Sequence, residues 1–169
     1  MRHKMSGRGL SRSTNQRKML RRNLISDLFR HEKIKTTEAK AKAVRGKAEK
    51  LITLARNRGD AERLVELAED GNEEMLKQVL TDAQAARLLR LHADKDAEGL
   101  EREAHAITVH AQRTVAKTIT DRGVVERLFN DIAPRYLERP GGYTRIVRMG
   151  FRKGDAAEIV MLQLVGEKE

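Results

Sequence analysis

The chain has 169 residues, a mass of 19.2 kDa and a formal net charge of +10 at pH 7. It contains no cysteine, which excludes disulfide frameworks, thiolate zinc sites and cysteine nucleophiles. Its longest aliphatic run, Ile159–Leu162, is far shorter than the roughly 20 residues of a membrane span, and no apolar stretch follows the basic N-terminus as a secretory signal requires.

The charge is divided unevenly along the chain. Residues 1–58 hold 18 Lys and Arg against 4 Asp and Glu, a net charge of +14. Residues 59–112 hold 6 against 13, a net of −7, and residues 113–169 hold 11 against 8, a net of +3. A cationic surface of this strength favours a nucleic acid as partner.

Residues 1–14 mix Arg, Ser and Gly with almost no apolar side chains and no acid. Such a segment buries too little surface to fold alone, so we expect a basic arm that becomes ordered against an anionic partner. A solvated, disordered tail and an organelle transit peptide are the two alternatives.

A helix is predicted from about Asn15 to His31, because Leu20, Leu24 and Leu28 form an apolar stripe at helical spacing. Its other faces carry cations and suit phosphate contact, although a merely solvated charged face is the simpler interpretation. These cations are Arg17, Lys18, Arg21 and Arg22.

A short strand is predicted at Lys33–Lys35, and Thr36-Thr37 offers the N-cap of a second helix that runs to about Arg56. The first turns of this helix carry Lys40, Lys42 and Arg45, where the helix dipole favours acids. This placement indicates that an external phosphate completes the helix start.

The acidic middle of the chain is predicted to be helical, with Asp60 and Asn72 as caps, a break near Asp82 and a polar turn at Asp94–Gly99. We expect residues of about 62–109 to form an inserted helical hairpin. Its negative charge argues against phosphate contact, so the hairpin should point toward solvent or a protein neighbour.

The C-terminal third begins with a helix after Gly123 that Pro134 should end, followed by turn signals at Arg139–Gly142. Tyr143–Met149 and Glu158–Val165 are predicted to form a β-hairpin.

The residues offer no catalytic or metal site. None of the five histidines has metal-ligand spacing, and Gly7-Arg8-Gly9 lacks the context of a phosphate loop. We therefore expect no enzyme activity, no cofactor, no metal and no small-molecule substrate. The many separate cations favour a large structured RNA, but their spacing alone does not separate RNA from DNA.

Several motifs resemble bacterial large-subunit ribosomal protein seventeen (the L-seventeen family). At the N-terminal side these are Met1-Arg2-His3-Lys4, Ser6-Gly7-Arg8, Arg30-His31-Glu32, Ile34-Lys35-Thr36-Thr37, Lys40-Ala41-Lys42 and Leu51–Ala55. At the C-terminal side they are Leu128-Phe129, Ala133-Pro134-Arg135 and Gly141–Ile146. The likeness covers roughly 1–58 and 110–166, but the acidic segment has no place in the pattern, and Met5, Gln16 and Ala39 depart from it.

The resemblance implies an α+β fold. This fold has a basic N-terminal arm (1–14) and a domain over 15–169, in which helices pack on a small mixed sheet that ends in a C-terminal β-hairpin. The acidic helical hairpin at about 62–109 is expected as an insertion that the resemblance does not account for. The resemblance also implies a structural role in the large ribosomal subunit, in the cytoplasm, without catalysis. The partners it implies are large-subunit ribosomal RNA and neighbouring ribosomal proteins near the exit tunnel, with no membrane. A basic nucleoid-type DNA-binding protein is the alternative.

The residues predicted to contact RNA come from the arm, the first helix, the start of the second helix and the C-terminal segment. They are Arg2, His3, Lys4, Arg8, Arg12, Arg17, Arg21, Arg22, His31, Lys35, Thr36, Thr37, Lys40, Lys42, Arg45, Arg135, Arg139, Gly141, Gly142, Tyr143, Arg145 and Arg148.

Overall fold

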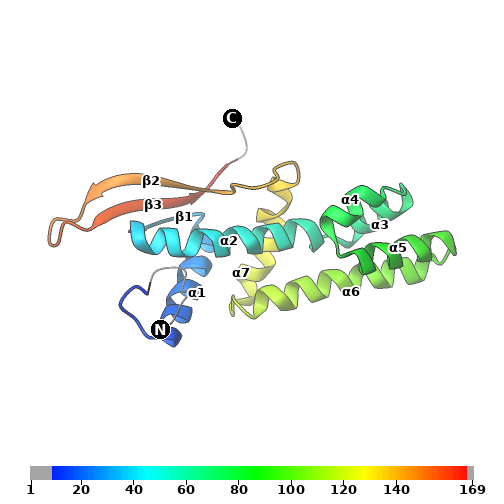
Figure 1. Ribbon diagram of the computed structural model, residues 1–169, viewed down its shortest axis with the longest axis horizontal. Coiled ribbons are helices and arrows are strands. Elements are labelled where there is room, and N and C mark those ends of the chain that lie inside the picture. Colours follow the sequence, from blue (N-terminus) through cyan, green and yellow to red (C-terminus); the bar gives the residue numbers. More distant parts are fainter. Residues whose placement is uncertain (1–8, 167–169) are drawn as a thin grey trace, which may run out of the picture.

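The computed structural model describes residues 9–166 (Figure 1). Within this range the chain forms seven α-helices, one π-helical and one 3-10 turn, and one three-stranded sheet. In order these are α1 (Thr14–His31), β1 (Lys33–Thr37), α2 (Glu38–Arg58), α3 (Ala61–Glu69), α4 (Glu73–Val79), α5 (Asp82–Ala93), α6 (Ala97–Ala116), α7 (Arg122–Arg127), η1 (Leu128–Ile132), η2 (Pro134–Tyr136), β2 (Thr144–Phe151) and β3 (Glu158–Leu164).

Local capping groups start and end α1. The hydroxyl of Ser13 accepts the backbone N–H of Gln16, and the Gln16 side chain accepts the N–H of Ser13, which together form a capping box. Gln16, which departs from the family pattern, therefore helps to cap α1 in this protein. The helix ends at Glu32, which adopts a left-handed conformation with φ 61° and leads directly into β1.

The sheet has the strand order β1-β3-β2, and both neighbours of β3 run antiparallel to it. The predicted hairpin of β2 and β3 is confirmed, whereas the prediction of a mixed sheet is wrong. Strands β1 and β3 lie more than a hundred residues apart in the sequence, and no local signal gives their relative direction. Helix α2 follows β1 directly and runs along the inner face of the sheet (Figure 1).

The main hydrophobic core lies between this inner face and helices α1, α2, the end of α6, α7 and η1. Its largest fully buried side chains include Phe29, Ile52, Leu128 and Leu162. The alternating residues Val160, Leu162 and Leu164 on β3 are all buried, as strand periodicity requires of an inward face.

The acidic segment builds a second core of its own from α3, α4, α5 and the first half of α6. The helical character predicted for about 62–109 is confirmed, and so are the caps: Asp60 accepts the N–H of Arg63 and Asn72 that of Met75. The segment contains four helices, and the predicted break near Asp82 and polar turn at Asp94–Gly99 are where α5 and α6 begin, after the caps Thr81 and Asp96. Helix α6 contributes Ile107 to this core and Val115 to the main one.

Pro134 does not end the helical path. It occupies the first position of η2, where its missing N–H costs nothing, so the chain runs helically from α7 through η1 to Tyr136. Among the residues 9–166, no helix has the length and apolar character needed to cross a membrane.

Candidate nucleic-acid interface

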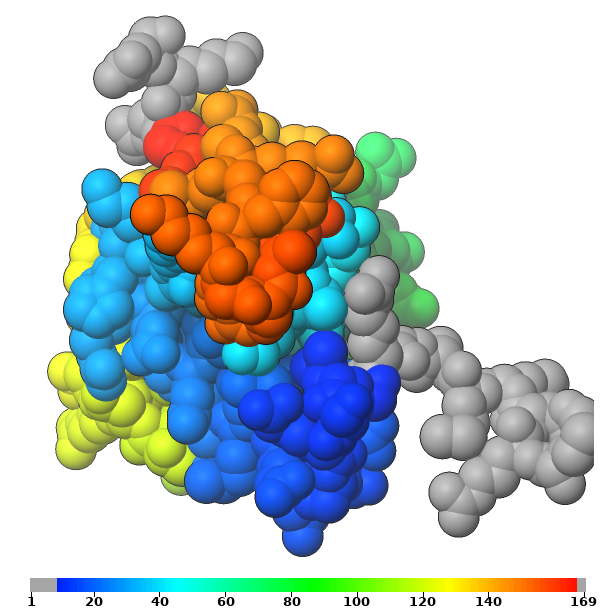
Figure 2. Space-filling model, turned by 90° about the vertical axis from the view of Figure 1, so that its left-hand side faces the viewer, coloured from blue at the N-terminus to red at the C-terminus, as the bar shows by residue number. Residues whose placement is uncertain are grey.

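One end of the molecule gathers the start of α1, the start of α2 and the tip of the β2–β3 hairpin. Figure 2 views the molecule from this end, with the hairpin (orange) above the start of α2 (cyan) and the start of α1 (dark blue). We call these segments, together with β1, the cationic end. The acidic helices α3, α4 and α5 lie at the opposite end (Figure 1).

The first half of α1 presents a cluster of cations without carboxylate partners among the described residues. Arg12 and Lys18 are exposed, and Arg17, Arg21 and Arg22 are partly exposed. Arg17 donates only to the hydroxyl of Thr14, at 3.2 Å. The Nε of Arg21 is buried and has no hydrogen-bond partner within residues 9–166.

The outer face of the sheet carries further cations on its two edge strands, β1 and β2. In register, Lys33 and Arg145 flank Gln163 of the central strand, and Lys35 lies beside Met161. Because neighbouring strands are about 4.8 Å apart, Lys33 and Arg145 stand roughly 10 Å from each other. Both are exposed, as is Lys35. The prediction missed Lys33, although its spacing of two from Lys35 places both on one strand face.

The start of α2 differs from the expectation in one respect. Its first residue is Glu38, so the helix supplies its own acid to the dipole, and Thr37 makes no side-chain cap bond. Lys42 lies 2.7 Å from Glu38, and Arg45 lies 3.3 Å from Glu49. Because Glu38 already supplies this acid, the start of α2 does not require the external phosphate that was expected there. Lys40 has no ion pair among the described residues.

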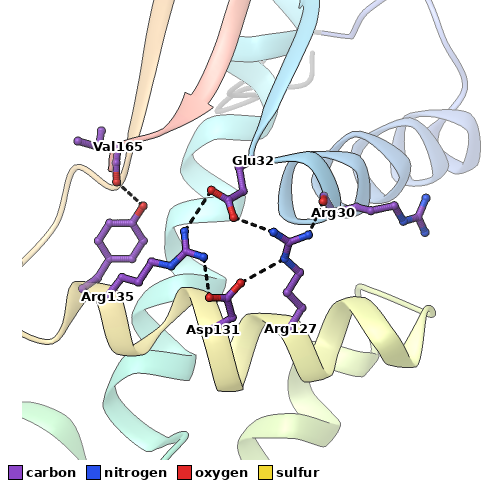
Figure 3. Close-up of polar contacts among 7 residues, drawn as sticks. Arg30, Glu32, Arg127, Asp131, Arg135 and Val165 are labelled. Atoms are coloured by element: carbon purple, nitrogen blue, oxygen red, sulfur yellow. Dashed lines mark hydrogen bonds and ion pairs between the residues drawn. The ribbon is translucent and has the colours of Figure 1, made fainter. Parts of the chain in front are cut away.

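Arg135 belongs to a partly exposed cluster of ion pairs (Figure 3). Its two terminal nitrogens donate to Glu32 at 3.1 Å and to Asp131 at 2.6 Å. Arg127 donates to the other oxygen of Glu32 at 2.7 Å and to the carbonyl of Arg30 at 2.6 Å, and its Nε lies 3.4 Å from Asp131. The cluster joins the end of α1 to α7 and the turns after it.

These contacts change the role of Arg135. Hydrogen bonds from Arg135 hold the pKa of the Asp131 carboxyl below its usual value of 3.8, and both carboxylates raise the pKa of the Arg135 guanidinium. Since both terminal nitrogens are engaged within the protein, Arg135 is a structural residue in this fold rather than a free phosphate ligand. Arg127, which contacts the same two carboxylates, was not among the residues singled out from the sequence.

Tyr143 is also a correction to the predicted RNA contacts, because its side chain is only 1% exposed. Its ring lies 4.9 Å from that of Tyr136 between centroids, tilted by 51°, and its hydroxyl lies 3.5 Å from that of Thr53. Tyr136 in turn donates to the carbonyl of Val165 at 2.6 Å, and burial raises the pKa of its hydroxyl. The two tyrosines thus fasten the C-terminal strand to the core.

The remaining predicted residues are distributed as follows. Arg2, His3, Lys4 and Arg8 lie outside the described residues. His31, Gly141, Gly142, Arg145 and Arg148 are exposed, and Thr36, Thr37 and Arg139 are partly exposed. The carbonyl of Arg139 accepts a 2.6 Å hydrogen bond from Arg56, which holds the turn at 139–142 against α2, and Gly142 has a φ of 66° that favours glycine.

Comparison with known proteins identifies relatives over nearly the whole chain. The family model described as Ribosomal protein L17 matches residues 20–165. The large ribosomal subunit protein bL17 of Pelobacter propionicus is 38% identical over 168 residues, which cover 99% of this chain and 94% of that protein. The protein of the same name from Clostridium botulinum is 39% identical over 158 residues, covering 94% and 96%. These matches extend across residues 62–109, so the acidic segment lies within the aligned region.

Proposed function

The chain belongs to the Ribosomal protein L17 family, and we propose that, as a structural constituent of the large ribosomal subunit, it uses its cationic end to bind large-subunit ribosomal RNA. It acts without catalysis, by holding RNA segments in place during assembly and translation. Its expected location is the ribosome in the cytoplasm.

The observation that supports RNA binding most strongly is the separation of paired from unpaired cations. In α1, β1, the start of α2 and β2, the side chains of Lys18, Lys33, Lys35, Lys40 and Arg145 are without carboxylate partners in the part of the chain that the structure describes. Unpaired cations held on a rigid scaffold repel one another, and phosphate groups relieve this repulsion.

The arrangement of these cations favours a folded RNA. They project from two helices and a sheet that meet at one end, so they do not follow a single line as contacts along one duplex groove do (Figure 2). Several RNA segments that come together in a large structured molecule match such a surface.

We propose a different role for the acidic segment of about 62–109. Its own hydrophobic core and its position opposite the cationic end support an appendage that points away from the RNA. In the ribosome this appendage would face solvent or a neighbouring large-subunit protein, and the exit-tunnel region is where we expect those neighbours.

The test measures binding of the full chain to a large-subunit ribosomal RNA transcript between 50 and 200 mM salt. With about 6–10 phosphate contacts, affinity should fall roughly 10³- to 10⁵-fold over this range. The triple variant Arg17→Gln, Lys18→Gln, Arg22→Gln should weaken binding and reduce the slope of log affinity against log salt by up to about 3.

The matched control is Arg90→Gln, Lys95→Gln, Arg102→Gln, which removes the same charge from the acidic segment, where all three side chains are exposed. It should leave the slope unchanged. A salt-independent affinity, equal effects of the two triple variants, or displacement of the RNA by duplex DNA on equal terms would contradict the proposal.

A further inference from the structure

The most exposed large apolar side chain in residues 9–166 is Phe151, which is 75% exposed at the end of β2. The other two phenylalanines, Phe29 and Phe129, are buried in the main core. A chain with so few aromatic residues that leaves one of them in solvent presents a feature that packing within the monomer does not explain.

A β-bulge directs Phe151 to a particular side of the sheet. The register with β3 shifts between Arg148 and Gly150, and Gly150 has a φ of 101°, a conformation that favours glycine. Because of the shift, Phe151 pairs with Glu158 instead of lying on the outer face with Val147. Glu158 belongs to the strand face of Val160 and Leu162, so Phe151 lies on the side of the sheet where α2 begins.

The turn that follows Phe151 is held rigidly. The Nε and one terminal nitrogen of Arg152 donate to the two oxygens of Asp155, at 2.7 and 2.5 Å, and hold the pKa of that carboxyl at about 2. Backbone bonds between Arg152, Ala156 and Ala157 close the turn. The aromatic ring therefore stands on a preorganised support, which reduces the entropy cost of a contact with a partner.

The charges around the ring are those of a nucleic-acid contact. Glu158 is ion-paired with Arg148 at 3.1 Å and Asp155 with Arg152, so the two acids of the tip are already neutralised. Lys153, the next residue of the turn, is exposed and has no ion pair among the described residues. Arg148 also lies 3.9 Å from Glu38, which ties the hairpin to the start of α2 within the cationic end.

We propose that Phe151 is a base-stacking residue, which receives one unpaired nucleobase of the RNA while Lys153 and the neighbouring cations contact its backbone. This inference rests on the proposed function and assigns a particular contact to it. An RNA partner offers few apolar surfaces other than the faces of its bases, and stacking on an aromatic ring is the usual way in which a protein holds a splayed base. Protein interfaces, in contrast, are depleted in lysine, and a lysine adjoins this ring.

The first measurement compares the affinities of the full-length variants for a large-subunit ribosomal RNA transcript at constant salt. Phe151→Ala should lower affinity about 5- to 100-fold, and Phe151→Leu should lose a similar amount because it keeps apolar area without an aromatic face. Phe151→Tyr should stay within about threefold of the unmodified chain. Thermal melting should be the same for all, since the side chain is exposed.

The second measurement uses the absence of tryptophan from the chain. Phe151→Trp introduces a single tryptophan whose emission should be strongly quenched when a base stacks on it. Met75→Trp in α4, at a position that is 37% exposed in the acidic segment, is the matched control and should keep its emission when RNA is added.

The outcomes separate this inference from the proposed function. Unchanged RNA affinity of Phe151→Ala, full affinity of Phe151→Leu, or unquenched emission of Phe151→Trp in the bound state overturns the stacking role, and steep salt-dependent binding would then leave the proposed function intact. If the unmodified chain does not bind the RNA, both the stacking role and the proposed function are overturned. An exposed ring that is needed only for joining a protein neighbour would show unchanged RNA affinity in every Phe151 variant.

Discussion

Arg135 and Arg145 carry the same charge in different surroundings. Both terminal nitrogens of Arg135 donate to carboxylates, whereas Arg145 is exposed on the outer sheet face and has no ion pair within residues 9–166. The first joins parts of the fold, and the second is available to a phosphate. In a strongly basic protein, the contacts of each cation therefore indicate whether it stabilises the fold or is available to RNA, which its charge alone does not.

The ion cluster of Glu32, Arg127, Asp131 and Arg135 makes stability depend on pH. Since Arg135 lowers the pKa of Asp131 in the folded state, this carboxylate stabilises the protein above pH 3.8 and loses that effect as the pH falls through its folded pKa. We expect Asp131→Asn to lose about 0.5–1 kcal/mol at neutral pH, because the cluster is partly exposed, and to show a shallower decline below pH 4. Urea unfolding between pH 2.5 and 7 measures both.

The control for this pH dependence is Asp70→Asn, which removes an exposed carboxylate without an ion pair in the described part of the chain. It should follow the unmodified protein across the pH range. Parallel curves for Asp131→Asn and the unmodified protein would show that the cluster does not contribute to the acid sensitivity.

At the scale of secondary structure, Gly46 inside α2 and Gly59 just after it are in opposite situations. An added Cβ at Gly46 meets nothing within 4 Å, so Gly46→Ala should stabilise the helix by about 0.5–1 kcal/mol. At Gly59, just beyond the helix, an added Cβ would lie 2.2 Å from the carbonyl oxygen of Ala55 and 2.8 Å from Phe129. Gly59→Ala should therefore destabilise the protein by about 1–3 kcal/mol.

Denaturant unfolding of the two glycine variants provides the comparison, with each acting as the other's control because the chemical change is identical. Shifts of the same sign at Gly46 and Gly59 would contradict the packing of α2 against η1. The position of Gly59 also matters because it directly precedes Asp60, the cap of the first acidic helix.

The sequence predicts elements well where the signal is local. The leucine spacing of α1, the caps Asp60 and Asn72 and the alternation on β3 each depend on residues a few positions apart. It failed where distant segments meet: the direction of β1 relative to β3, the burial of Tyr143 and the capture of Arg135 by Glu32, 103 residues away. The sequence predicts the cationic character of the site. Only the contacts in the structure separate the cations that stabilise the fold from those that are available to a phosphate.

At the scale of the whole molecule, charge is polarised between two ends. The segment 59–112 has a net charge of −7, and the hairpin tip and the starts of α1 and α2 lie at the far end from its helices (Figure 1). Electrostatic effects of exposed charges fade over the Debye length of about 8 Å at physiological salt. The acidic helices should thus have little influence on RNA held at the cationic end.

Neutralising α3 with Glu62→Gln, Glu66→Gln and Glu69→Gln tests this separation without cutting the chain. The affinity for large-subunit ribosomal RNA at 150 mM salt should change by less than about twofold, because all three side chains are exposed and distant from the cationic end. Filter binding or fluorescence titration measures this affinity. A change of tenfold or more would mean that RNA reaches the acidic helices.

The strand order has a consequence for how the protein is made. Strand β1 pairs with β3 and not with anything near it in sequence, so the sheet is incomplete until residues 158–164 have been synthesised. The second core uses only residues between Leu64 and Ile107 and is available much earlier in translation. Because domains fold as their residues emerge, the acidic helices should form first, while α1 and α2 wait with part of their apolar surface uncovered. RNA-binding competence therefore comes last, with the final strand.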